Sequence, residues 1–127
     1  MRSQLSGYRD LKVYERSYAG ARSIYKLTQS YPKEEVYGIS SQMRRSSLSI
    51  ALNIAEGYAK RESQAEFKRF LYMALGSANE LSVLIEFSKD LGYIGEEVYL
   101  KASKEYEEIS KMLNALIQTI TRQNNHI

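Results

Sequence analysis

The chain has 127 residues, of which 43% are hydrophobic and 26% charged, the size and composition of one globular domain. A chain of this length buries roughly two thirds of its unfolded surface, enough for one core without disulfides or metals. Cysteine is absent, which excludes a disulfide framework, a thiolate nucleophile and a cysteine-ligated zinc site. No apolar run is long enough for a membrane span, and residues 1–5 lack the apolar region of a secretory signal, so we expect a cytoplasmic location and no membrane partner.

Four stretches with helical periodicity follow one another, at about residues 10–30, 40–58, 63–90 and 96–122. The one proline, Pro32, separates the first two, because proline cannot continue a helix. All the connections are short, so successive helices should lie side by side in opposite directions. The sequence therefore predicts an all-α fold, an up-down-up-down four-helix bundle, as a single domain over residues 1–127.

Local signals indicate where these helices begin and end. Ser40 is the expected N-cap of the second helix, and Gly57 lies where that helix should stop. Ser63 and Glu66 form a capping box at the start of the third helix, in which the Ser63 hydroxyl accepts from the Glu66 amide and Glu66 reaches back. Gly92 supplies the C-terminal stop of the third helix.

Apolar residues recur at helical spacing on every helix. We assign these apolar stripes to the core. In the first helix the stripe passes through Leu11, Tyr14, Tyr18, Ala21, Tyr25 and Thr28, and it is widened by Val13, Ser17, Ile24 and Leu27. In the second helix it passes through Ile39, Met43, Ser47, Ile50, Ile54 and Tyr58, and in the third through Phe67, Phe70, Leu71, Ala74, Ala78, Leu81 and Ile85. The second and third helices carry more apolar surface than one bundle covers, and contiguous exposed apolar surface usually marks an interface. We expect a homo-oligomer; the alternative is that wide stripes simply cover a well-packed bundle. The residues assigned to the oligomer interface are Leu48, Leu52, Ala55, Tyr72, Val83 and Phe87.

Charge is distributed unevenly along the chain. Residues 1–70 contain 13 Lys and Arg against 7 Asp and Glu, whereas residues 71–127 contain 5 against 8. This asymmetry favours an anionic partner for the first half, although the charges could equally scatter over solvated helix faces. An exposed Tyr58 could also stack on an unpaired base. The candidate nucleic-acid contacts are Arg44 and Arg45, early in the second helix, and Lys60, Arg61, Lys68 and Arg69 near its other end.

The residues that catalysis requires are scarce. The one histidine is His126, next to the C-terminus, which argues against a Ser-His-Asp triad, a Cys-His pair and an HExxH zinc site. No phosphate-binding glycine motif occurs. Asn53 and Glu56 lie one helical turn apart, and we interpret them as a structural polar network rather than a metal or acid–base site. We expect no enzyme activity, no metal, no cofactor and no small-molecule substrate.

The segment Arg44–Gly57 resembles the signature of the bacterial "four helix bundle protein" family, also called the large-subunit rRNA intervening-sequence protein family. Further stretches are similar to the same family: Asp10–Val13 at its opening, Glu66–Phe67, Arg69–Leu71 and Ala74–Ser77 in the third helix, and Leu91–Ile94 in the turn that follows. The resemblance covers about residues 8–95, and the fourth helix matches only in its pattern. The family often has proline where this chain has Ala51, so the second helix is expected to be straighter here.

The resemblance implies a four-helix bundle that assembles into a ring-like homopentamer. Genes of the family often lie inside intervening sequences of large-subunit rRNA genes, and a related branch resembles the accessory protein of diversity-generating retroelements, which binds nucleic acid through a basic surface. With the basic first half of the chain, this implies a non-catalytic oligomer associated with nucleic acid, with RNA as the expected partner. The alternative is a protein-interaction scaffold or accessory subunit, for example for a retroelement reverse transcriptase.

Overall fold

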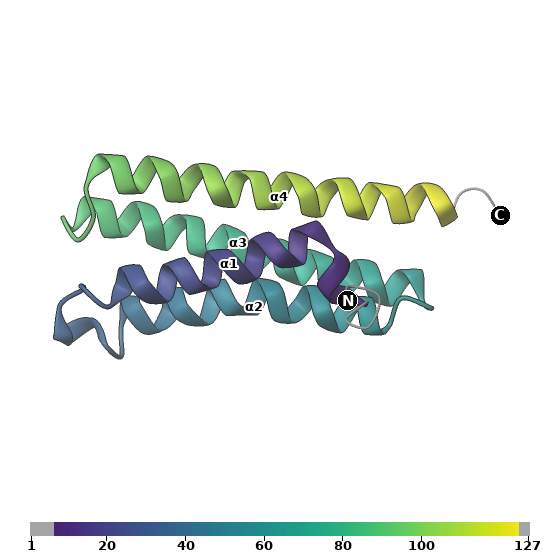
Figure 1. The fold of residues 1–127 in the computed structure, drawn as a ribbon, viewed down its shortest axis with the longest axis horizontal. Helices are drawn as coiled ribbons and strands as arrows, with labels where there is room; N and C mark the ends of the chain where they lie inside the picture. The colour runs from purple at the N-terminus through teal and green to yellow at the C-terminus, as the bar shows by residue number, and fades with distance from the viewer. Residues whose placement is uncertain (1–6, 125–127) are drawn as a thin grey trace.

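The computed structural model describes residues 7–124, which form four long helices. The helices are α1 (Lys12–Thr28), α2 (Ile39–Ala59), α3 (Gln64–Asp90) and α4 (Glu96–Asn124), and the short 3₁₀ helices η2 (Tyr8–Asp10) and η3 (Lys33–Glu35) precede α1 and α2. They run alternately in opposite directions (Figure 1). The predicted all-α, up-down-up-down bundle is confirmed, and the helix bounds fall within two residues of the predicted ones.

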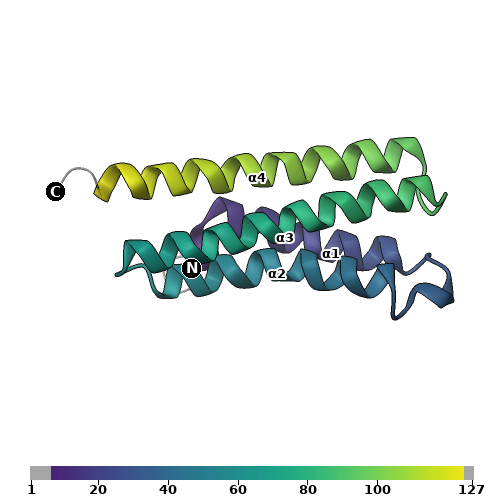
Figure 2. The same ribbon diagram turned by 180° about the vertical axis from the view of Figure 1, so that it is seen from behind.

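The four helices do not pack equally closely. Helices α2 and α3 lie against each other along their length, and α4 lies beside α3 (Figures 1 and 2). Helices α1 and α4, which close the bundle on its remaining side, touch over a much shorter stretch. None of the described helices combines the length and apolar character that a membrane span requires.

The predicted core stripes of α2 and α3 are the buried faces of these helices. Met43, Ile50 and Ile54 of α2 are fully buried against Leu71 and Leu81 of α3 in one apolar cluster. This pattern follows from the i, i+3, i+4 spacing, which places every member on one side of the helix. The same cluster includes other buried residues of α3 and α4: Ala74, Ala78, Ile85, Tyr106, Ile109, Leu113, Ile117 and Ile120.

The predicted core stripe of α1 is wrong for two of its tyrosines. Tyr18 is 48% and Tyr25 43% exposed, whereas the predicted Val13, Ser17, Ala21, Ile24 and Thr28 are buried, together with Gly20, which the prediction did not include. The physical reason lies on α4, whose Tyr106 reaches across the core: a Cβ added at Gly20 would stand 2.6 Å from the Tyr106 hydroxyl oxygen. A large residue on α4 therefore requires small ones on α1.

Two predicted boundaries of α2 are also wrong. The helix begins at Ile39, so Ser40 is a buried residue inside it and Gly38 is the N-cap. The carboxylate of Glu35 replaces the predicted cap by accepting from the Ile39 amide at 3.2 Å. Gly57 does not end the helix, which continues to Ala59; a Cβ there would lie 2.9 Å from Phe70 Cβ. Gly57 therefore serves the close approach of α2 to α3.

The ends of α3 follow the prediction more closely. The Ser63 hydroxyl accepts from the Glu66 amide at 3.2 Å, as predicted, but the Glu66 side chain is bound by Arg69 instead of reaching back. Gly92 follows α3 with a φ of 81°. Its amide donates to the Lys89 carbonyl and the next amide to the Ser88 carbonyl, a Schellman motif that needs this left-handed conformation.

One contact joins the two loops at the end of the bundle where α2 and α4 begin. The Tyr93 hydroxyl, which follows α3, donates to Glu35 at 2.7 Å, and the rings of Tyr31 and Tyr93 lie 5.1 Å apart. This hydrogen bond raises the pKa of Tyr93. Because Glu35 also accepts from the Ile39 amide, one carboxylate links the start of α2 to the α3–α4 connection.

Candidate nucleic-acid interface

Arg44 and Arg45, the first two predicted contacts, lie on α2 beside different neighbours. Arg44 donates from Nε to the Thr28 hydroxyl at 2.8 Å and from Nη2 to the Tyr25 carbonyl at 3.3 Å, so it satisfies acceptors at the C-terminal end of α1. Arg45 is exposed and pairs with Glu80 of α3, with 3.6 Å between their charged atoms. Both side chains are thus already engaged within the chain.

Two of the predicted contacts, Lys60 and Arg61, lie on the α2–α3 turn against aromatic rings. The Arg61 guanidinium lies 4.1 Å from the centre of the Tyr58 ring and donates to the Tyr58 carbonyl at 3.0 Å. The Lys60 amine lies 5.0 Å from the centre of the Phe70 ring and 3.9 Å from the Glu56 carboxylate. The Tyr58 ring is half-buried, and the Arg61 guanidinium lies over it.

Arg69 and Lys68, the last two, point to different sides of α3. Arg69 joins the turn cluster over the Phe70 ring and donates to both carboxylate oxygens of Glu66, at 2.8 and 3.1 Å. These hydrogen bonds lower the pKa of Glu66. Lys68 instead donates to the Thr121 hydroxyl of α4 at 3.3 Å. The structure therefore gathers Lys60, Arg61 and Arg69, next to two carboxylates, and leaves the other three apart.

A second basic surface, absent from our sequence prediction, lies between α1 and α2. Here a groove of about 560 Å³ has Arg22 and Lys26 on its α1 side. Neither side chain forms an ion pair or a hydrogen bond with the described residues, and no carboxylate lines the groove. The remaining lining residues are Tyr18, Ala21, Tyr25, Gln29 and Leu48.

Arg44, one of the predicted nucleic-acid contacts, lies next to this α1–α2 groove. Its guanidinium is 5.0 Å from the centre of the ring of Tyr25, which lines the groove. One sequence signal could have revealed the groove. Between Arg16 and Lys33 the chain contains no acidic residue, although it contains Arg22 and Lys26. These two residues lie four apart on one helix and therefore face the same way.

The residues assigned to an oligomer interface fall into two groups. Leu48 and the half-buried Ala55 lie on the side of α2 that faces α1, and Leu52 is 58% exposed beside them. The α3 group is more exposed: Tyr72 is 57%, Val83 64% and Phe87 53% exposed in the single chain. The two groups belong to α2 and α3, the pair of helices that pack most extensively against each other.

Asn53 and Glu56 do not share one polar network. Asn53 donates to the Ser49 carbonyl at 2.9 Å and to the Ser49 hydroxyl at 3.0 Å, and Ser77 of α3 donates to the same hydroxyl at 3.0 Å. Glu56 is exposed and its partner is Lys60. The polar network therefore links α2 to α3 through serines that the sequence prediction did not include.

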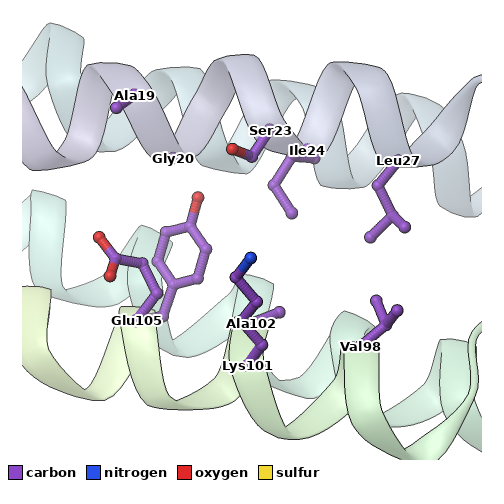
Figure 3. Close-up of a pocket in the computed structure, with 10 residues that line it drawn as sticks. Ala19, Gly20, Ser23, Ile24, Leu27, Val98, Lys101, Ala102 and Glu105 are labelled. Atoms are coloured by element: carbon purple, nitrogen blue, oxygen red, sulfur yellow. The ribbon is translucent and has the colours of Figure 1, made fainter.

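The short α1–α4 contact leaves a cleft of about 400 Å³. Figure 3 shows Ile24 and Leu27 of α1 pointing toward Val98 of α4 across it. Burial, and secondarily the charge of Glu105, raises the pKa of Tyr106 in this cleft, while two hydrogen bonds of 2.9 Å from Arg16 hold Glu105 itself. Ser23, Lys101 and Glu105 line this cleft, and no hydrogen bond joins them to one another. No group of metal-binding side chains occurs among residues 7–124. The single histidine, His126, lies outside the described residues.

These features define the class of the protein: an all-helical bundle that carries basic residues on its outer helix faces. Residues 9–115 match the model of the 23S rRNA-intervening sequence protein family. The chain therefore belongs to this family, as its signature segments predicted.

A solved structure shows the same fold in a relative. The chain is similar to a Bacteroides thetaiotaomicron protein of unknown function from the S23 ribosomal protein family, with 34% identity and a TM-score of 0.74. The similarity covers 83% of this chain and 97% of that one. Among curated proteins no relative matches the chain.

Proposed function

We propose that the protein is a non-catalytic, self-associating protein that binds nucleic acid on the α1–α2 face. The observation that carries this proposal is the α1–α2 groove, where Arg22 and Lys26 have no carboxylate partner within residues 7–124. The family description names 23S rRNA intervening sequences, which favours RNA as the partner. A cytoplasmic location fits such a partner.

The carboxylates near each basic surface favour the α1–α2 groove over the α2–α3 turn as the binding site. At the α2–α3 turn Lys60 and Arg69 already face Glu56 and Glu66, so a phosphate would have to compete with carboxylates that are held in place. In the α1–α2 groove a phosphate would meet cations that are balanced only by mobile counterions. Releasing these counterions is the main source of affinity for a polyanion, and the affinity should therefore fall steeply with salt.

The proposal is tested by fluorescence anisotropy with a labelled RNA stem-loop at low and high salt. Reversing both groove charges in R22E/K26E should lower the affinity roughly tenfold or more, because at least two phosphate contacts become repulsive. The matched control is K101E/K104E, which makes the same change in net charge on exposed lysines of α4. No binding by the unmodified chain at low salt would refute the proposal, and so would an equal loss in both variants.

Self-association is the second part of the proposal, and the exposed α3 side chains Tyr72, Val83 and Phe87 support it. Three large apolar groups on one helix face are costly to leave in water, and burying each adds on the order of 1 kcal/mol or more. We propose a homopentameric ring, the assembly that the family resemblance implies. The same exposed side chains also fit the alternative of a scaffold or accessory subunit that docks on another protein.

A further inference from the structure

Exposed aromatic and basic side chains alternate on α1 along the α1–α2 groove. Tyr18, Arg22, Tyr25 and Lys26 follow each other at spacings of four, three and one, and all four line the groove. The two tyrosines are seven positions apart in the sequence, so their Cα atoms lie about 10 Å apart along the helix axis. The groove therefore offers two aromatic rings with a cation beside each.

Each of the two tyrosine rings is held by a neighbour and is still partly open. The ring of Tyr18 lies 6.0 Å from that of Tyr14, and the Arg44 guanidinium lies 5.0 Å from the centre of the Tyr25 ring. Nevertheless 48% of Tyr18 and 43% of Tyr25 remain exposed. Rings that are already ordered lose little conformational entropy when a ligand packs against them.

The floor of the groove is apolar, because Ala21 is buried there and Leu48 of α2 lines the opposite side. A ligand that fits must therefore combine flat apolar faces with negative charge a few ångströms away. A nucleotide has this combination, since its base stacks on aromatic rings while its phosphate pairs with a cation. We infer that the α1–α2 groove binds an unpaired strand of nucleic acid, with bases on Tyr18 and Tyr25 and phosphates at Arg22 and Lys26.

This inference rests on the proposed function and narrows it to single strands. In a duplex the bases stack on each other and expose only their edges, so tyrosines in a groove reach no base face without costly unstacking. Phosphate contacts alone carry no such preference, because both strands of a duplex present phosphates. Stacking on the two tyrosines therefore predicts a preference for single strands over duplexes, which phosphate contacts alone would not produce.

The competing occupant is a second copy of the chain, since the exposed Leu48 of α2 lines the groove. A two-fold contact between two copies of this groove would place Arg22 and Lys26 against their own counterparts, and like charges repel. A head-to-tail contact in a ring would bring a different face of the next copy to the groove, and the light-scattering measurement described below detects it. An anionic strand matches the charge of the groove, whereas the two-fold contact does not.

The test compares a labelled oligouridylate with a duplex of equal strand length, by fluorescence anisotropy at low salt. The unmodified chain should bind the single strand at least roughly tenfold more tightly. Y18L/Y25L should lower single-strand affinity between about tenfold and a hundredfold and leave duplex affinity unchanged, because only the stacking surface is removed. Y18F/Y25F keeps that surface and should restore binding. The control Y37L removes a tyrosine that is 97% exposed elsewhere and should change nothing.

The outcomes separate the inference from the proposed function. If both probes bind equally and Y18L/Y25L changes neither affinity, while R22E/K26E weakens both, the inference is overturned and the proposed function stands. If the unmodified chain binds neither probe, both are overturned. If Y18L/Y25L reduces the particle mass in light scattering and leaves single-strand affinity intact, the groove is a subunit contact and the inference fails. Equal circular dichroism spectra of the variants confirm that folding is unchanged.

Discussion

The hydroxyl of Tyr106 lies in the core against Gly20 without a hydrogen-bond partner among the described residues. An unmade hydrogen bond of a buried hydroxyl costs about 1–3 kcal/mol, because the group has lost its water. The ring itself is well used, since it fills the space beneath the small residues of α1. At this position the polar atom opposes folding and the aromatic ring supports it.

Tyr106→Phe should therefore raise the free energy of unfolding by about 1 kcal/mol, as measured by urea denaturation. It removes the unpartnered oxygen and keeps the ring. Tyr37→Phe, on an exposed ring, is the control and should change little. Gly20→Ala should destabilise the bundle, and less so in the Tyr106→Phe background, because the closest contact of the new Cβ is the hydroxyl oxygen. A loss of stability in Tyr106→Phe would contradict the assignment.

The exposed tyrosines of α1 show why residue-level prediction failed there. Tyr18 and Tyr25 fit a helical stripe, and tyrosine counts as apolar in such a pattern although its hydroxyl favours the surface. The inward face combines predicted residues such as Val13 and Ile24 with Gly20, which carries no hydrophobic signal. That face is understandable only once Tyr106 is known to fill it, a contact between residues 86 positions apart.

At the scale of helices, two glycines within helices should respond oppositely to alanine. Gly57→Ala places a methyl 2.9 Å from Phe70 Cβ and 3.2 Å from Phe67 Cδ1, so α2 and α3 must move apart at a cost of about 1–3 kcal/mol. Gly76 of α3 has open space around its Cα, and Gly76→Ala should gain up to about 1 kcal/mol from helix propensity alone. Thermal unfolding of the two variants checks the pair; equal shifts would show that Gly57 has no packing role.

Helices were more predictable than their caps. The stripes of α2 and α3 were read correctly because large apolar residues such as Ile50 and Leu81 repeat on one face. The N-terminus of α2 was not predicted correctly. Its cap is the side chain of Glu35, in the preceding turn, and not the adjacent Ser40. Caps of this kind depend on how a loop folds back, which periodicity does not describe.

At the scale of the whole molecule, the exposed α3 face should control assembly. Val83→Lys with Phe87→Lys should reduce the particle mass in light scattering to that of one chain, because two buried apolar contacts become charged. The control is Leu100→Lys, on an equally exposed leucine of α4. If the unsubstituted protein has the particle mass of a single chain at micromolar concentration, self-association is refuted.

The candidate site was only partly visible in the sequence for a related reason. Charge runs drew attention to Arg44, Arg45 and the α2–α3 turn, but the structure shows these cations occupied by neighbours such as Glu80 and Glu66. Arg22 and Lys26 do not belong to a run of charged residues in the sequence. In the structure they differ from the other cations because no carboxylate of the described residues pairs with them. Unpaired charge is a property of the packed molecule, so a linear charge count does not find it.

The hydrogen bond between Tyr93 and Glu35 has a consequence for how the bundle opens. It ties together both interhelical loops at one end, whereas at the other end a single turn joins α2 to α3. We therefore expect transient opening to be directional: α1 and α4, which touch over a short stretch, should separate first at the end far from Tyr93. The tied end acts as the hinge of this motion, and amide protection along α1 and α4 should rise toward it.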